Sequence, residues 1–85
     1  MIKKEKHLKV ERDILIFAFR YSLGRMSYAP YKVVDTIKSN IKNISTDDIK
    51  LYIKEIKECQ NFGMDFDKSI WLDFLEYLEE ELKKR

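Results

Sequence analysis

Residues 18–30, AFRYSLGRMSYAP, contain two arginines, two tyrosines, a glycine and the only proline of this 85-residue chain. Arginine and aromatic side chains are enriched at protein interfaces, so Arg20, Arg25 and Tyr28 are candidate partner-binding residues. The same segment also suits a corner between two helices, where Arg20 and Arg25 would pair with acidic side chains or bond to the last carbonyl groups of a helix. The two interpretations are compatible, and the sequence leaves both open.

Groups that could act in catalysis are sparse in the rest of the chain. Nucleophilic catalysis requires a nucleophile beside a base, but the single cysteine, Cys59, and the single histidine, His7, lie on different predicted segments. Cys59 is therefore interpreted as a small core or boundary residue. Two glycines cannot form a glycine-rich phosphate loop, and the sequence has no EF-hand loop or HExxH motif. We predict a protein that is not an enzyme, with no catalytic residue, no metal site and no cofactor.

The net charge of +2 is close to neutral, but the charges are unevenly distributed. Residues 1–44 carry ten Lys or Arg and four Asp or Glu, a net charge of +6, whereas residues 45–85 carry seven and eleven, a net charge of −4. The two halves could attract each other within one fold, or the basic half could bind nucleic acid. The candidate phosphate contacts are Lys3, Lys4, Lys6, Lys9 and Arg12.

The sequence predicts a protein of a reducing cytoplasm that does not enter a membrane. Its N-terminal segment, MIKKEKHLKVERD, lacks the apolar run of a signal peptide. The longest apolar run, ILIFAF, is far too short to span a bilayer. A single cysteine also cannot form an internal disulfide.

Hydrophobic periodicity indicates an all-α fold in a single domain that spans residues 1–85. Four helices are predicted, over about residues 10–23, 29–41, 46–61 and 68–83, and their short connections predict a compact bundle. The very short link between the first two helices predicts a sharp corner there. Residues 1–8 are expected either to extend the first helix or to form a mobile basic arm.

Each predicted helix has an apolar stripe that is expected to face the core. Ser45 is the expected N-cap of the third helix, with Asp48 at the third helical position, and Asp67 is the expected N-cap of the fourth. In the first helix the expected inward side chains are Ile14, Phe17, Ala18 and Tyr21, and those beside them are Leu15, Phe19 and Ser22. In the other helices they are Val33, Val34, Ile37, Ile41, Ile49, Tyr52, Ile53, Ile56, Ile70, Trp71, Phe74, Leu75, Leu78 and Leu82.

The segment AFRYSLGRMSYAPYKVVDTI resembles a group of small, mostly uncharacterised proteins of bacteriophages and prophages, whose shared pattern is approximately AFRYALGRxTY followed by an apolar helix. A later segment, FGMDFDKSIWLDFLEYLE, is similar to a second shared region with an acidic residue, a lysine and a tryptophan. The resemblance covers about residues 11–80. Ser22 and Ser27 stand where the pattern has Ala and Thr. The motif carries no recognised chemistry, so it transfers no site residue.

The resemblance implies a small accessory protein that binds a larger host or phage protein and modulates or inhibits it, for example a CRISPR effector or another part of host defence. Two alternatives stay open. One is a nucleic-acid-binding or regulatory protein that uses the basic half, although a third helix that alternates Lys with acidic residues offers no clean basic face to a DNA groove. The other is a homo-oligomeric structural protein.

Overall fold

The computed structural model describes residues 11–23, 29–59, 62 and 65–85, and all regular structure in these residues is helical. The predicted all-α fold with four main helices is confirmed. The predicted corner at residues 24–28 and the predicted arm at residues 1–8 lie outside the described residues. The helices are α2 (Arg12–Ser22), α3 (Ala29–Ser39), the short 3-10 helix η1 (Ile41–Asn43), α4 (Thr46–Glu58) and α5 (Asp65–Lys84).

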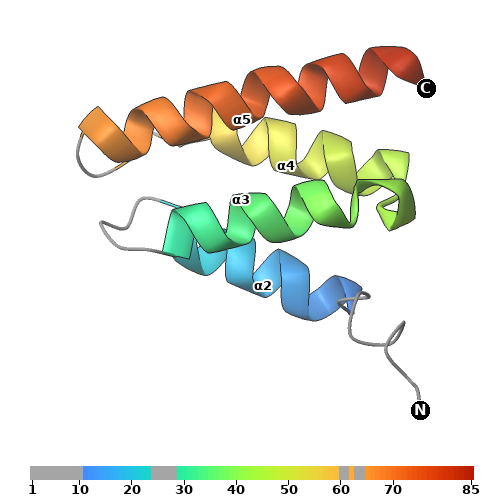
Figure 1. Ribbon diagram of the computed structural model, residues 1–85, viewed down its shortest axis with the longest axis horizontal. Helices are drawn as coiled ribbons and strands as arrows, with labels where there is room; N and C mark the ends of the chain where they lie inside the picture. The colour runs from blue at the N-terminus through green and yellow to red at the C-terminus, as the bar shows by residue number, and fades with distance from the viewer. Residues whose placement is uncertain (1–10, 24–28, 60–61, 63–64) are drawn as a thin grey trace.

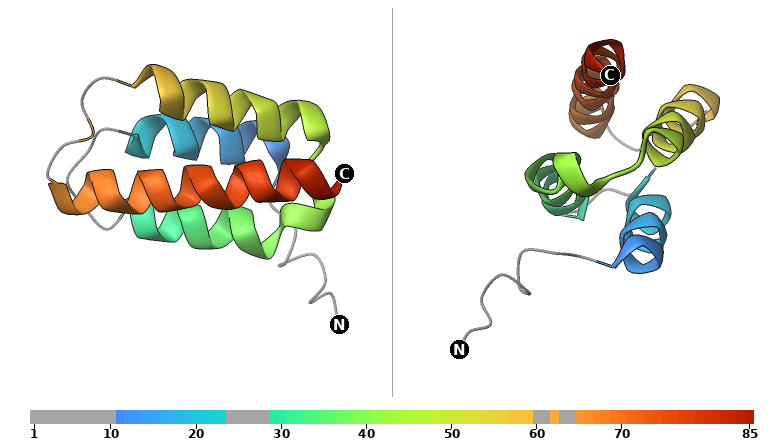
Figure 2. Two further views of the ribbon diagram at one scale, coloured as in Figure 1. Left: turned by 90° about the horizontal axis from the view of Figure 1, so that it is seen from above. Right: turned by 90° about the vertical axis from the view of Figure 1, so that its right-hand side faces the viewer.

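The four long helices form a bundle in which α2 packs against α3, α3 against α5 and α5 against α4 (Figures 1 and 2). Two ion pairs, Arg12 with Asp48 and Arg20 with Glu55, show that helix α4 also lies beside α2. The paired residues are 36 and 35 positions apart in the sequence, so α2 and α4 run parallel with a nearly constant offset. The consecutive helices α3 and α4 therefore lie across a diagonal of the bundle, and η1 lies in the connection between them (Figure 2).

The core is centred on four buried aromatic side chains from three helices. Phe19 of α2 lies between Tyr52 of α4 and Trp71 of α5, with ring centroids 4.6 Å and 5.6 Å away, respectively. Phe74 of α5 follows at 6.1 Å from Trp71. Aromatic pairs at such separations contribute about 0.5–1.5 kcal/mol beyond the area that they bury. This cluster therefore fixes which face of α2 is turned inward.

The prediction for the buried face of α2 was wrong. Ile14, Phe17 and Tyr21 are exposed, and only Ala18 of the four expected inward residues is even half-buried. The physical reason is that α2 is apolar around most of its circumference, so the period of the pattern does not select a face. The packing of Phe19 on its aromatic neighbours selects it instead. The buried residues of α2 are Leu15, Ile16, Phe19 and Ser22.

The inward stripes predicted for the other helices are confirmed. Four of their expected members are half-buried at the margin of the core: Ile41, Ile70, Leu75 and Leu82. The buried members are Val33, Val34, Ile37, Ile49, Tyr52, Ile53, Ile56, Trp71, Phe74 and Leu78.

None of the helices in the described part of the chain has the length and apolar character that crossing a membrane requires.

Helix ends differ from the predicted boundaries by a few residues. Helix α3 ends at Ser39, and the side-chain amide of the next residue, Asn40, donates to the carbonyl oxygen of Thr36 at 2.8 Å. The N-cap of α4 is confirmed, since the Ser45 hydroxyl accepts the Asp48 N–H at 3.1 Å. Asp67, the predicted N-cap of α5, lies inside that helix. Acidic residues are favourable both at the N-cap and in the first turn of a helix. The segment DFD (residues 65–67) therefore does not show which of its residues is the N-cap and which lie in the first turn.

Candidate functional site

The outer surface of α2 carries three exposed apolar side chains, Ile14, Phe17 and Tyr21, which we call the α2 stripe. Their exposed fractions are 59%, 69% and 54%. Their spacing of three and four positions places them on one face of the helix. The rings of Phe17 and Tyr21 are stacked, with centroids 6.2 Å apart. A contiguous exposed apolar surface of this kind marks interaction sites on proteins.

A shallow hollow of about 210 Å³ lies beside the α2 stripe, between α2 and α3. Its wall is mostly apolar, because the Thr36 hydroxyl donates to the carbonyl oxygen of Lys32 at 2.8 Å and Ala18 contributes only a methyl group. The hollow therefore suits an apolar side chain of a docking molecule. The lining residues are Ile14, Leu15, Ala18, Lys32, Val33 and Thr36.

Arg20 lies on one flank of the α2 stripe and also joins α2 to α4. Its Nη2 and Nε donate to the Glu55 carboxylate at 2.6 Å and 3.0 Å. The hydrogen bond to Glu55 and the charge of that carboxylate raise the pKa of Arg20, so the guanidinium stays charged. None of the hydrogen bonds among the described residues uses its Nη1. Arg20 therefore has donor groups left for a contact outside the molecule.

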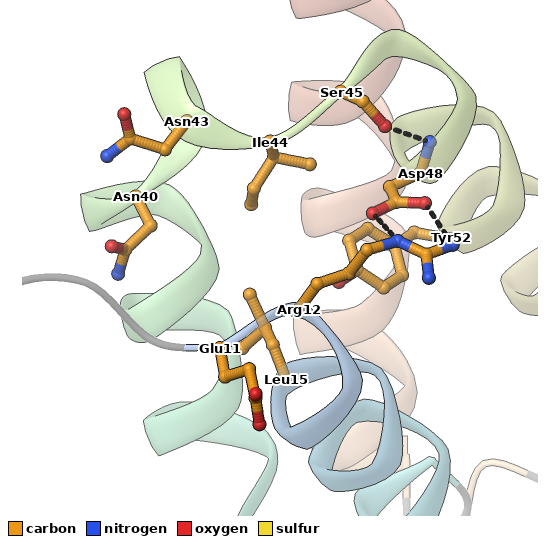
Figure 3. Close-up of a pocket in the computed structure, with 9 residues that line it drawn as sticks. All are labelled: Glu11, Arg12, Leu15, Asn40, Asn43, Ile44, Ser45, Asp48 and Tyr52. Atoms are coloured by element: carbon orange, nitrogen blue, oxygen red, sulfur yellow. Dashed lines mark hydrogen bonds and ion pairs between the residues drawn. The ribbon is translucent and has the colours of Figure 1, made fainter.

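A larger pocket of about 540 Å³ lies at one end of the bundle, where the beginning of α2 meets the connection from α3 to α4 (Figure 3). The polar centre of this pocket is a bidentate ion pair, in which Nε and Nη2 of Arg12 donate to the carboxylate oxygens of Asp48 at 2.7 Å and 2.9 Å. The Asp48 side chain is only 8% exposed. The hydrogen bond from Arg12 to Asp48 and the negative charge of the Asp48 carboxylate raise the pKa of Arg12. The lining residues are Glu11, Arg12, Leu15, Asn40, Asn43, Ile44, Ser45, Asp48 and Tyr52.

The remaining polar groups of this pocket offer little reactivity. Burial raises the pKa of Tyr52 to about 12, and the Asp48 carboxylate acts in the same direction. The phenol is therefore neutral near pH 7 and supplies neither a base nor an anionic nucleophile. Among the described residues, no group of three His, Cys, Asp or Glu side chains could hold a metal ion. The pocket is better explained as the polar end of the bundle, closed on one side by Arg12 and Asp48.

The structure describes only some of the residues singled out from the sequence. Of the candidate partner-binding residues, Arg20 lies beside the α2 stripe, whereas Arg25 and Tyr28 lie outside the described residues. Of the candidate nucleic-acid contacts, Arg12 is paired with Asp48. The other four candidate contacts also lie outside the described residues: Lys3, Lys4, Lys6 and Lys9.

Cys59, the predicted core or boundary residue, is half-buried directly after the end of α4, so that prediction is confirmed. It lines an open hollow of about 230 Å³ together with Arg20, Leu23, Glu55 and Glu58. His7 lies outside the described residues. The prediction that the cysteine and the histidine do not form a catalytic pair stays a prediction.

The α2 stripe and the role of Asp48 were not predicted from the sequence. A signal for the stripe was present, because the run ILIFAF has more apolar side chains than one helix face can hold. A helix with two apolar faces can bury one in its own core and present the other. The signal for Asp48 was weaker: it lies one turn before the buried Tyr52, on the inner side of α4.

Comparisons with protein-family models, curated proteins and solved structures found no match for this chain. The resemblance to phage and prophage proteins therefore stays a prediction.

Proposed function

We propose that this chain is a non-enzymatic interaction protein that binds a larger protein through the α2 stripe and thereby modulates or inhibits it. The observation that carries the proposal is the exposure of Phe17, at 69%, between two further exposed apolar side chains. A single exposed apolar residue is ordinary on a protein surface, whereas a contiguous exposed apolar group of this size is often functional. Covering these side chains removes them from water, which provides the driving force for association.

The residues around the α2 stripe also support a protein partner. Interfaces typically have an aromatic centre that is bordered by polar and charged groups. Phe17 and Tyr21 provide such a centre, and the exposed Arg20 and Lys32 provide positive charges at its border. A complementary partner would present apolar side chains with acidic residues beside them.

We further propose that the partner belongs to a machine of a host cell, including defence systems such as CRISPR effectors. This part of the proposal rests on the resemblance of AFRYSLGRMSYAP to phage and prophage proteins. Nucleic-acid binding has less support, because both arginines of α2 are already neutralised by carboxylates of α4. A phosphate contact would have to compete with those ion pairs.

Site-specific photocrosslinking tests the proposal. A photoreactive phenylalanine analogue is placed at Phe17, and the folded protein is irradiated in a bacterial lysate. We expect an adduct with a protein of discrete mass, because position 17 lies at the centre of the proposed contact. The matched control carries the analogue at Leu72, which is also apolar and exposed but lies on α5.

Equal adducts at positions 17 and 72, or no adduct with another protein at position 17, would contradict the proposal. An adduct of twice the mass of this chain reports a contact between copies and is counted separately. Once a partner has been identified, Phe17→Glu should weaken its binding at least tenfold, whereas Leu72→Glu should leave it nearly unchanged.

A further inference from the structure

We propose that a second copy of this chain docks on the α2 stripe, with the two α2 helices antiparallel and Phe17 of each copy packed on Phe17 of the other. The inference rests on the proposed function, because it uses the same surface, and it adds a form of regulation. A dimer of this kind hides the surface that binds the partner protein. Rising concentration of the chain would therefore reduce the fraction that is free to bind.

The spacing along α2 suits a helix–helix contact. Ile14 and Tyr21 are two helical turns apart with Phe17 between them, which is the spacing of the apolar seam in a paired helix. A two-fold axis through the two Phe17 side chains places Ile14 of each copy beside Tyr21 of the other. Such a contact uses one surface twice and therefore closes as a dimer. Among the described helices, α2 lies at a corner of the bundle with α3 and α4 beside it (Figure 2), and these helices leave its outer side for a further helix.

The charges beside the α2 stripe select the antiparallel arrangement. Asp13 and Arg20 are also two turns apart, on the same flank of the stripe, and their side chains are 86% and 53% exposed. When two helices pair antiparallel, this flank of one copy meets the same flank of the other. Asp13 of each copy then lies next to Arg20 of the other, which forms two symmetric ion pairs. In a parallel arrangement this flank would instead meet the side that carries Ala18 and Lys32, so Asp13 would not lie next to Arg20 of the other copy.

Arg20 can make this contact without giving up its contact with Glu55. It donates to Glu55 through Nε and Nη2, so its Nη1 group can donate to Asp13 of the second copy. Asp13 in turn makes only a long contact within the described residues, at 3.4 Å from Nη1 of Arg12. Both partners of the proposed ion pair are thus exposed and chemically complementary.

The opposite flank of the α2 stripe has an apolar hollow with Lys32 of α3 at its edge. Ala18 is small, and the hollow of about 210 Å³ lies next to it. Tyr21 of the second copy would lie beside Ile14, at the edge of this hollow. The apolar part of its ring can therefore enter the hollow, while the hydroxyl stays at the border.

The area available fits a weak and reversible dimer. A large apolar side chain has roughly 150–250 Å² of surface, so the exposed fractions give roughly 300–450 Å² for the α2 stripe. A stable interface typically covers about 800 Å² on each partner. We therefore expect a dissociation constant in the micromolar range or weaker, which permits exchange with another protein.

Sedimentation equilibrium of the purified chain, from low micromolar to millimolar concentration, tests the inference. We expect a monomer–dimer equilibrium that Phe17→Glu weakens at least tenfold and that the matched control Leu72→Glu leaves unchanged. Charge reversal provides the sharper test. Asp13→Arg and Arg20→Asp should each weaken the dimer several-fold, and the double reversal should restore it because the ion pairs re-form with exchanged signs.

Arg20→Asp also removes the contact with Glu55, so Glu55→Gln serves as its control and should leave the dimer intact. Circular dichroism establishes that each variant is folded before its association is measured. A chain that stays monomeric at millimolar concentration overturns the inference. So does a dimer that Phe17→Glu does not weaken, or one that the double charge reversal fails to restore.

The outcomes separate this inference from the proposed function. If the chain stays monomeric but position 17 crosslinks to another protein, the occupant of the stripe is that protein and the inference is wrong. If the dimer forms through Phe17 but no other protein crosslinks in the lysate, the inference stands and the proposed function fails.

Discussion

Trp71 shows how one buried residue can both stabilise the fold and carry a local cost. Its side chain is fully buried and contacts Phe19 and Phe74. Its indole N–H has no hydrogen-bond acceptor among the residues that the structure describes. A buried donor without an acceptor costs about 1–3 kcal/mol, which the burial of the large ring offsets.

Replacing Trp71 separates these two contributions. Trp71→Ala should lower the free energy of unfolding by about 3–5 kcal/mol, because it leaves a large cavity. Trp71→Phe should cost less than half as much, since it keeps an aromatic ring and removes the unpaired donor. Urea unfolding followed by circular dichroism measures both, with the exposed Leu72→Ala as the control. Equal losses for the two Trp71 variants would contradict this account of the indole N–H.

Tyr52 predicts a defined dependence of stability on pH. Burial raises its pKa to about 12 from an unperturbed value of 10.0. The folded state therefore holds the phenolic proton more tightly than the unfolded state. The resulting stability is fully present below pH 10 and is lost as the pH rises from about 10 to about 12, by at most about 1.4 kcal/mol for each pH unit.

Tyr52→Phe lacks this proton and provides the comparison. The difference in the free energy of unfolding between the natural chain and Tyr52→Phe should be constant below pH 10 and should move against the natural chain above it. Both proteins retain all other tyrosines and lysines, so the titration of those groups largely cancels. A difference that stays constant up to pH 12 would show that the Tyr52 hydroxyl is not buried in this way.

At the scale of single helices, the sequence predicted α4 well because its local signals agree. Ser45 caps its beginning, and its apolar positions repeat with one clear period. Ser45→Ala should lower the free energy of unfolding by about 1 kcal/mol, because the N–H of Asp48 loses its acceptor. The control is Ser39→Ala, an exposed serine at the end of α3, which should change stability by less than about 0.5 kcal/mol. If Ser45→Ala and Ser39→Ala lowered the stability in thermal unfolding by similar amounts, the result would contradict a stabilising cap at Ser45.

Helix α2 was predicted less well because its orientation is not a local property. Its existence followed from the sequence, but its apolar residues fit two faces. The contact of Phe19 with Tyr52 and the ion pair of Arg12 with Asp48 decide between them. These contacts join residues that are more than 30 positions apart, and no pattern within α2 contains them. The candidate site was missed for the same reason, since it is the face that those contacts leave outside.

At the scale of the whole molecule, the uneven charge along the chain is explained in part by attraction within the fold. The ion pairs of Arg12 with Asp48 and Arg20 with Glu55 each join the basic half to the acidic half. Lys38 of the basic half also lies 4.9 Å from the ring centroid of Tyr77 on α5. These contacts support the interpretation that the two halves of the chain attract each other within one fold.

Arg85 ties α5 to the connection between α3 and α4. Its Nη2 and Nη1 donate to the carbonyl oxygens of Ile41 and Ile44, each at 2.8 Å. Arg85→Ala should therefore increase amide hydrogen exchange at Asn43 and Ile44, whose own backbone bonds belong to this connection. Exchange in the middle of α4, for example at Ile53, serves as the internal reference and should not change. Unchanged exchange at Asn43 and Ile44 would show that the connection is held by other contacts.

The parallel pairing of α2 with α4 has a consequence for the time course of folding. The neighbours α2 and α3, and likewise α4 and α5, are joined by short segments and can associate early, whereas the ion pairs between α2 and α4 close a loop of about 35 residues. Contacts that form after the transition state slow unfolding without speeding folding. Arg12→Met should therefore raise the unfolding rate and leave the folding rate nearly unchanged in stopped-flow measurements. The attraction between the two halves would then determine how long the folded molecule persists more than how fast it forms.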